Sequence, residues 1–228
     1  MTTFHTSAFL QRHVWSLSLS LGAALCFAQL ASELAEGELT PFDTAVGASV
    51  AQWRGSVDQP MLALTRLGNP VPVFAFMVVV VITLVGYSRR RDALYLALCA
   101  SCTLALNIGM KALFHRARPG AETIYLLHVP TSFSFPSGHA MCSAGVFASL
   151  AVVVQRLGWP RAWAHVVAAA CLLLLMGVGA SRIYFGVHFA SDVVGGQLAS
   201  VACVSAFTGW FYPRLLPGEA TFPEAPRL

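Results

Sequence analysis

The chain has 228 residues, of which 57% are hydrophobic and 11% are charged, and its mean hydropathy is +0.68. This composition is far more apolar than that of an ordinary water-soluble domain and predicts a membrane protein. Thirteen arginines and one lysine give a net charge of +4. They form no basic run of the kind that binds nucleic acid, so we expect membrane lipid, and no nucleic acid, as the partner.

Six apolar segments follow one another along the chain, and several reach the roughly 20 residues that a helix needs to cross a bilayer. They cover about residues 14–31, 71–87, 93–114, 140–154, 163–180 and 189–212. The first also resembles a signal peptide, but its cleavage signal is poor and we favour a retained helix. The sequence therefore predicts an all-α bundle of six transmembrane helices that forms a single domain over residues 1–228.

The positions of the arginines predict the topology. Residues 88–91 and 155–161, together with short tails at 1–13 and 214–228, carry basic residues and are expected on the cytoplasmic side. The connections between the first and second, third and fourth, and fifth and sixth spans then lie outside. The composition, rich in arginine, alanine and valine, indicates a bacterial inner membrane with the functional side facing outward.

The first outer connection, residues 32–60, contains apolar residues at helical spacing from Phe42 to Val57. This pattern is typical of an amphipathic helix at the membrane interface. Pro60 is expected to end this helix. It could gate lipid entry or serve only as a connector that lies on the membrane surface.

Four basic residues break the topological pattern, because Lys111, Arg116, Arg118 and Arg182 fall on the outer side near the ends of apolar helices. Charges close to hydrocarbon are costly and usually mark a function. Arginine offers a planar fork and lysine a point charge for phosphate oxygens. Lys111, Arg118 and Arg182 are therefore candidates for binding phosphate.

The same outer connections contain the other groups that a phosphate ester site requires. Ser137 and Gly138 open the fourth span, where free backbone amides and the helix dipole favour an anion. His188 and Asp192 lie four residues apart, so the carboxylate can orient one ring nitrogen while the other attacks phosphorus. His139 is the candidate general acid for the leaving oxygen.

Each of these residues also has a structural interpretation. A histidine and an aspartate at this spacing often form a helix cap, and an arginine in a loop often meets lipid headgroups. An accidental arrangement is much less plausible for the whole set, because two histidines, an aspartate and four cations would have to gather on one face of an apolar bundle.

Three segments, KALFHRARP from Lys111, PSGH from Pro136 and SRIYFGVHFASD from Ser181, match three motifs of a known family in order and spacing. Over residues 111–192 the chain resembles the type 2 phosphatidic acid phosphatases. The resemblance implies that His188 forms a phosphohistidine, that His139 is the acid and that Asp192 assists. It further implies phosphate binding by five residues: Lys111, Arg118, Ser137, Gly138 and Arg182.

The resemblance also implies catalysis without a metal or other cofactor and inhibition by vanadate. His115, Arg116 and Tyr184 lie inside the motifs and could contact a headgroup. The apolar loop from Ala121 to Phe135 is expected at the membrane interface, where a lipid could enter laterally. Candidate substrates are undecaprenyl diphosphate, phosphatidate, phosphatidylglycerophosphate and lipid A, and the sequence does not rank them.

Three alternatives remain open from the sequence. The same phosphohistidine could transfer its phosphoryl group to a lipid or sugar acceptor. A lipid-binding or lipid-flipping protein could retain the site without catalysis, although the complete set of reactive groups argues against it. Vanadium haloperoxidases share the motifs but are soluble, which six apolar spans disfavour. The sequence leaves the oligomeric state open.

Overall fold

The computed structural model describes residues 4–128 and 131–212, with side chains from residue 14 onward, and within these ranges it is helical without strands. The elements are α1 (Phe4–Glu36), α2 (Thr40–Ala51), α3 (Asp58–Leu67), α4 (Pro70–Gly86), α5 (Arg90–Phe114), η1 (Ala121–Thr123), α6 (Gly138–Val154), α7 (Arg161–Tyr184) and α8 (Ala190–Phe211). The predicted all-α fold is confirmed. The predicted tail at 214–228 lies outside the described residues, while α1 already begins at Phe4.

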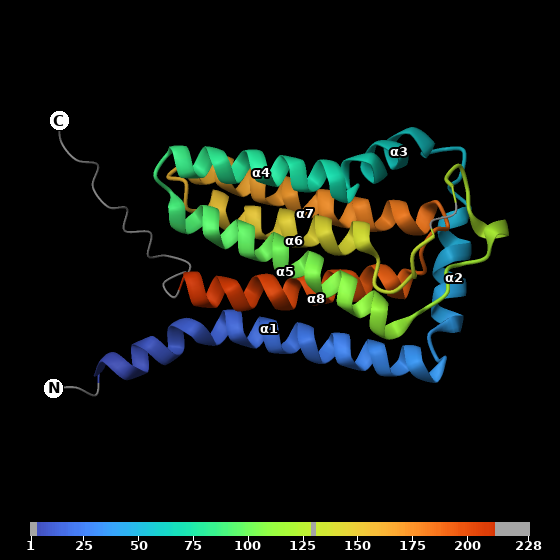
Figure 1. The fold of residues 1–228 in the computed structure, drawn as a ribbon, viewed down its shortest axis with the longest axis horizontal. Helices are drawn as coiled ribbons and strands as arrows, with labels where there is room; N and C mark the ends of the chain where they lie inside the picture. The colour runs from blue at the N-terminus through green and yellow to red at the C-terminus, as the bar shows by residue number, and fades with distance from the viewer. Residues whose placement is uncertain (1–3, 129–130, 213–228) are drawn as a thin grey trace.

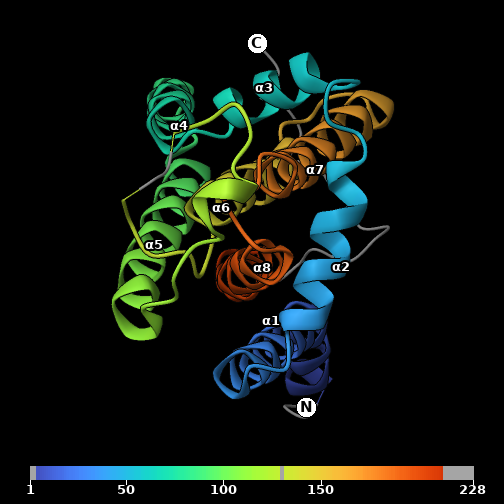
Figure 2. The same cartoon turned by 90° about the vertical axis from the view of Figure 1, so that its right-hand side faces the viewer.

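Long helices run side by side, and α8 packs against α1, α5 and α6 (Figure 1, Figure 2). α6 also packs on α7, and α4 covers α5. Most of the core lies between these helices, with Tyr95 and Leu96 of α5 and Val146 and Val153 of α6 fully buried. Large apolar side chains on the outer faces remain exposed, as expected where a helix meets lipid rather than water.

In the part of the chain that the structure describes, four helices, α1, α5, α7 and α8, are long and apolar enough to cross a membrane. α3 and α4 form a fifth candidate if they are taken together, although they are bent by 55° at their junction. Asn69 caps α4 there by accepting a hydrogen bond from Val71 N at 3.0 Å, and Pro70 occupies the first helical turn. α6 is an apolar helix of only 17 residues. All six predicted spans are helices, but six complete crossings stay a prediction.

The first outer connection differs from the sequence-based expectation. A single amphipathic helix ending at Pro60 is wrong, because α2 already stops at Ala51 and Pro60 lies in the first turn of α3. Proline is tolerated in a first turn, where backbone amides have no partner within the helix. α2 lies across the ends of the long helices (Figure 1).

The two ends of the bundle carry different segments. The start of α1, the end of α8 and the α4–α5 and α6–α7 connections lie at one end, while α2, α3, η1 and the loops around them lie at the other (Figure 1). α5 terminates at this second end, where His115 adopts a left-handed conformation with φ 46°. The chain thus turns directly into the segment that carries Arg116 and Arg118.

Close packing of α5 on α6 is testable through glycine substitutions. A Cβ at Gly145 would lie 2.5 Å from Oγ1 of buried Thr103, so Gly145→Ala should destabilise the protein by about 1–3 kcal/mol. Gly109→Ala is the control, because a Cβ there meets nothing within 4 Å. Thermal unfolding in detergent should show a lower Tm for the first variant only, and equal Tm values would contradict this packing.

Candidate functional site

The three sequence motifs come together at the end of the bundle that carries α2. The end of α5 and the segment after it supply the first motif, the start of α6 supplies the second, and the end of α7 with the loop into α8 supplies the third. In Figure 1 these segments converge beside α2 and η1. The predicted site residues therefore surround one region, although they are far apart in the sequence.

The predicted pairing of His188 with Asp192 is present. Nδ1 of His188 lies 3.2 Å from Oδ2 of Asp192, and both side chains are almost completely buried. Nε2 of His188 lies 3.0 Å from Nη1 of Arg118, which can only donate a hydrogen bond. The network therefore assigns the proton to Nδ1 and leaves the lone pair of Nε2 pointing toward the cationic side of the site.

The environment of His188 favours the neutral ring. Burial lowers the pKa of His188 to about 4, and the charges of Arg118 and Arg182 act in the same direction. The hydrogen bond and the charge of Asp192 oppose this shift. At neutral pH the ring is consequently uncharged, and its Nε2 lone pair can accept the hydrogen bond from Arg118.

Two cations act on the ring of this histidine, Arg118 from 3.0 Å at Nε2 and Arg182 through its charge. Arg118 donates from Nη1 to Val187 O at 2.7 Å and from Nε to Ser132 O at 2.7 Å. Lys111 donates to the carbonyl of Phe133. Burial at the start of α6 lowers the pKa of His139 to about 3, and the positive charges of Arg182, Arg118 and Lys111 act in the same direction.

The start of α6 contributes further donors. Ser137 is the N-cap of α6, and its amide donates to Asp192 O at 3.0 Å. Among the described residues, Ser137 Oγ and Arg182 Nε are buried without a hydrogen-bond partner. Such atoms are uncommon in folded proteins, and a bound anion would give each of them a partner. A Cβ at Gly138 would lie 3.3 Å from Asn107 Oδ1, so this position is also closely packed.

A second carboxylate, which sequence analysis did not assign to the site, supports the same histidine from α2. Arg116 donates to Asp192 Oδ1 at 2.6 Å and to Asp43 Oδ2 at 2.7 Å. Asp43 is buried and also accepts hydrogen bonds from the amide and hydroxyl of Ser191 at 2.8 and 2.7 Å. α2 is thereby joined to the first turn of α8. In the amphipathic pattern of this connection Asp43 falls on a face away from the apolar residues, so no sequence signal indicated this role.

Ser134 was also not predicted. Its hydroxyl donates to Asp192 Oδ2 and lies 3.4 Å from Nδ1 of His188. The amide of Phe189 donates to the same carboxylate oxygen at 3.0 Å. Asp192 is therefore held by donors on both oxygens. A serine inside an apolar loop gave no pattern that could have identified it.

The three candidates for headgroup contact occupy different environments. Arg116 is engaged by two carboxylates, and Tyr184 is buried with its hydroxyl bonded to Asp58 and to Trp53 O. Neither side chain is free to meet a headgroup as the structure stands. His115 is exposed, and its ring packs edge-on against Phe133 with centroids 4.6 Å apart.

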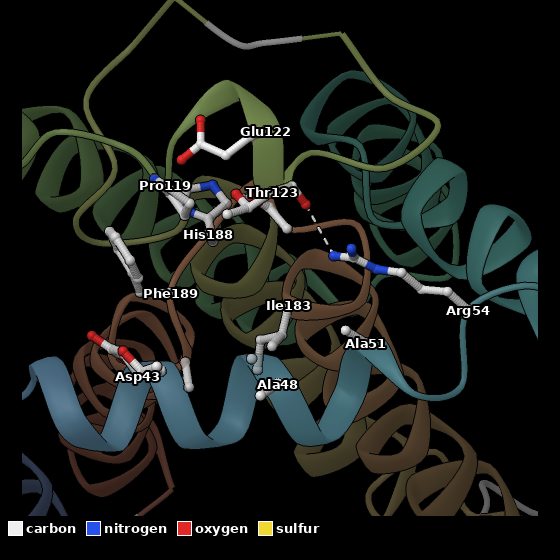
Figure 3. A pocket seen from close by; sticks show the side chains of 14 residues that line it. Asp43, Ala48, Ala51, Arg54, Pro119, Glu122, Thr123, Ile183, His188 and Phe189 are labelled. Atoms are coloured by element: carbon white, nitrogen blue, oxygen red, sulfur yellow. Dashed lines mark hydrogen bonds between the residues drawn. The ribbon is translucent and has the colours of Figure 1, made fainter.

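A cavity of about 430 Å³ opens beside His188. Its walls come from α2, from the segment around η1 and from the end of α7 with the loop into α8 (Figure 3). Gly47, Ala48 and Ala51 line it on α2, while Glu122 and Arg54 provide charged groups. This volume lies in the range typical of small-molecule sites.

The apolar loop before α6 covers this region. Ile124, Tyr125 and Leu127 pack against a buried cluster of Tyr184, Phe185 and Val187. Leu126 and Phe133 remain exposed, whereas Phe135 is fully buried. Val129 lies outside the described residues. The predicted position of the loop at the membrane interface stays a prediction.

Comparisons with known proteins agree on one family. A model described as the PAP2 superfamily matches residues 92–215. Phosphatidylglycerophosphatase B of Bacillus subtilis (strain 168) is 31% identical over 144 residues, which are 61% of this chain and 68% of that protein. A protein of Escherichia coli (strain K12), provisionally named an undecaprenyl-diphosphatase, is 32% identical over 144 residues, 61% of this chain and 66% of its own.

A solved structure has the same fold. The crystal structure of a transmembrane PAP2-type phosphatidylglycerolphosphate phosphatase from Bacillus subtilis aligns with a TM-score of 0.77 and 27% sequence identity. The alignment covers 84% of this chain and 95% of that one.

The protonation state of His188 is directly measurable. An ordinary histidine, with a pKa of about 6.5, is mostly protonated at pH 5.5, whereas His188, with its pKa lowered to about 4, should remain neutral there. Histidine-selective NMR in detergent, with His188→Gln to assign the signal, measures this. Asp192→Asn should lower the pKa further, because the Asp192 charge raises it. Titration of His188 near pH 6.5 would contradict this environment.

Proposed function

The chain belongs to the PAP2 superfamily of integral membrane lipid phosphatases, and from that membership and the site geometry we propose that it hydrolyses lipid phosphates through a phosphohistidine on His188. The arrangement of His188 carries this proposal. Its Nδ1 faces Asp192 at 3.2 Å, while its Nε2 faces the guanidinium of Arg118 at 3.0 Å. A phosphate drawn to that guanidinium would meet the lone pair of Nε2.

In the first step, Nε2 of His188 attacks phosphorus, and the bond from phosphorus to the lipid oxygen breaks. The negative charge of the bound phosphate would offset the burial and the nearby cations that lower the pKa of His139, and protonated His139 gives its proton to this leaving oxygen. Asp192, held by Arg116, Ser134 and the amide of Phe189, stabilises the positive charge that develops on the imidazole ring. The lipid product departs as an alcohol, or as a monophosphate when the substrate is a diphosphate.

In the second step, His139 takes a proton from water as that water attacks phosphorus. The bond from phosphorus to Nε2 then breaks, and inorganic phosphate is released with His188 neutral again. A sugar or lipid hydroxyl in place of water would make the protein a transferase.

Charge on the transferring phosphoryl group is balanced by Lys111, Arg118 and Arg182, together with the amides at the start of α6. Ser137 Oγ and Arg182 Nε support this assignment, because both are buried donors that lack a partner among the described residues. Arg118 would exchange its bond to Nε2 for a bond to a phosphate oxygen. These groups supply the stabilisation that the reaction needs, so we expect activity without a metal ion.

The site lies at one end of an apolar bundle, where a lipid can present its phosphate while its chains stay in hydrocarbon. We place this end on the outer side of a bacterial inner membrane, because the arginine-rich connections lie at the opposite end. Phosphatidylglycerophosphate and undecaprenyl diphosphate are the leading candidates, by analogy with the names of the relatives. Phosphatidate remains a candidate from the motifs.

Phosphate release by the detergent-purified protein in EDTA tests the reaction. His188→Ala should reduce release from the preferred lipid by at least about a thousandfold, because it removes the nucleophile. His165→Ala, an exposed histidine on α7 outside the motifs, is the matched control and should keep wild-type activity. Full activity of His188→Ala would refute the phosphohistidine, and a phosphorylated acceptor formed in place of free phosphate would indicate transfer.

The ion pair between Asp43 and Arg116 should also affect the rate of phosphate release, since it orients Arg116, which in turn binds Asp192. Asp43→Asn removes a buried charge-assisted hydrogen bond, so kcat should fall by about tenfold or more with a smaller change in KM. Glu38→Gln, an exposed acid just before α2, is the control for lost charge. An unchanged kcat in folded Asp43→Asn protein would show that the ion pair does not position the site.

A further inference from the structure

The cavity beside His188 also contains a cation that the proposed reaction does not use. Arg54 follows α2 and lines the same cavity as His188, on a different wall (Figure 3). It lies outside the three motifs and outside the matched range of 92–215. A charge that shares a cavity with the nucleophile, yet belongs to none of the phosphate-binding segments, requires its own explanation.

The guanidinium of Arg54 is held in place by neutral groups. Nε donates to Tyr184 O at 3.1 Å and Nη2 donates to Thr123 O at 3.0 Å. The guanidinium carbon also lies 5.3 Å from the centre of the Tyr125 ring. Gly186 permits this arrangement, because a Cβ there would lie 2.1 Å from Thr123 O and 3.0 Å from Arg54 Nη2.

The charge of Arg54 is not neutralised by the protein. Within residues 14–128 and 131–212, no carboxylate forms an ion pair with Arg54, whereas Arg116 has two. Nη1 of Arg54 makes no hydrogen bond in this part of the chain, so its two N–H groups remain available. The cavity therefore holds an oriented cation with free donors.

The acidic residues that line the cavity lie on other parts of its wall than Arg54. Glu122 lines the cavity and, in Figure 3, lies beside Pro119 with its carboxylate directed away from Arg54. Asp43 also lines the cavity, but Arg116 and Ser191 engage both of its oxygens. An anion would therefore be attracted at the Arg54 side and repelled at the Glu122 side.

We propose that Arg54 binds a second phosphate of the lipid substrate while the scissile phosphate is bound at His188. This inference rests on the proposed function and deepens it. It favours lipids with two phosphates, either separated by a glycerol or joined as a diphosphate, over a lipid with one phosphate. A single-phosphate lipid leaves the charge of Arg54 without a partner in the cavity.

A comparison of substrates with one and with two phosphates tests this assignment. Phosphate release is measured for phosphatidylglycerophosphate, undecaprenyl diphosphate and phosphatidate with wild type, Arg54→Gln and Arg54→Lys. In Arg54→Gln, kcat/KM for a two-phosphate lipid relative to phosphatidate should fall by about tenfold. Arg54→Lys keeps the charge and should retain part of this preference. Arg66→Gln, an exposed arginine on α3 outside the cavity, should leave the ratio unchanged.

The outcomes separate this proposal from the proposed function. A fall in the ratio for phosphatidylglycerophosphate alone, or for undecaprenyl diphosphate alone, supports the second site and identifies the lipid whose second phosphate binds there. An unchanged ratio would overturn it and leave Arg54 a structural residue, whether kcat/KM stays the same or falls equally on all three lipids. If wild type releases no phosphate from any of these lipids, or if release survives in His188→Ala, the proposed function itself fails.

Discussion

The site depends on a carboxylate buried at the start of α8. Asp192 is fully buried and accepts hydrogen bonds from an arginine, a serine, a histidine and a backbone amide. A charge in such a place is tolerated only when its hydrogen bonds are complete. Several segments must therefore be positioned together before this carboxylate is stable. The geometry that orients His188 is thus also a condition for stable folding at this end of the bundle.

The same constraint explains the arrangement of the surrounding elements. α5 ends where it can turn Arg116 inward, and the loop before α6 brings Ser134 to the other oxygen of Asp192. α2 adds Asp43, which binds the far side of Arg116. Two carboxylates share one guanidinium, so a net charge of −1 remains, and hydrogen bonds from Ser134, Ser191 and the amide of Phe189 stabilise it.

The sequence predicted the long helices well, because apolar length is a local property. It also identified three motifs that the structure brings together, while the roles of their residues stay a prediction. It predicted that His188 and Asp192 share a face, since a separation of four residues fixes this on a helix. It did not predict Ser134 or Asp43, which reach Asp192 and Arg116 only through tertiary folding. The end of α2 was misjudged for a related reason. Apolar periodicity continues past Ala51, and Pro60 fits the first turn of α3 as well as it fits a helix stop.

One wall of the cavity comes from a different part of the chain than the proposed chemistry. All the motif residues fall within the matched range of 92–215, whereas the wall formed by α2 and Arg54 precedes it. Substrate choice could therefore change through residues 44–54 of this wall while His188, the proposed nucleophile, stays constant. Asp43 limits that freedom, because it is bonded both to Arg116 and to Ser191. A chimera that exchanges α2 with a relative would need to keep an acid at this position to preserve the reactive geometry.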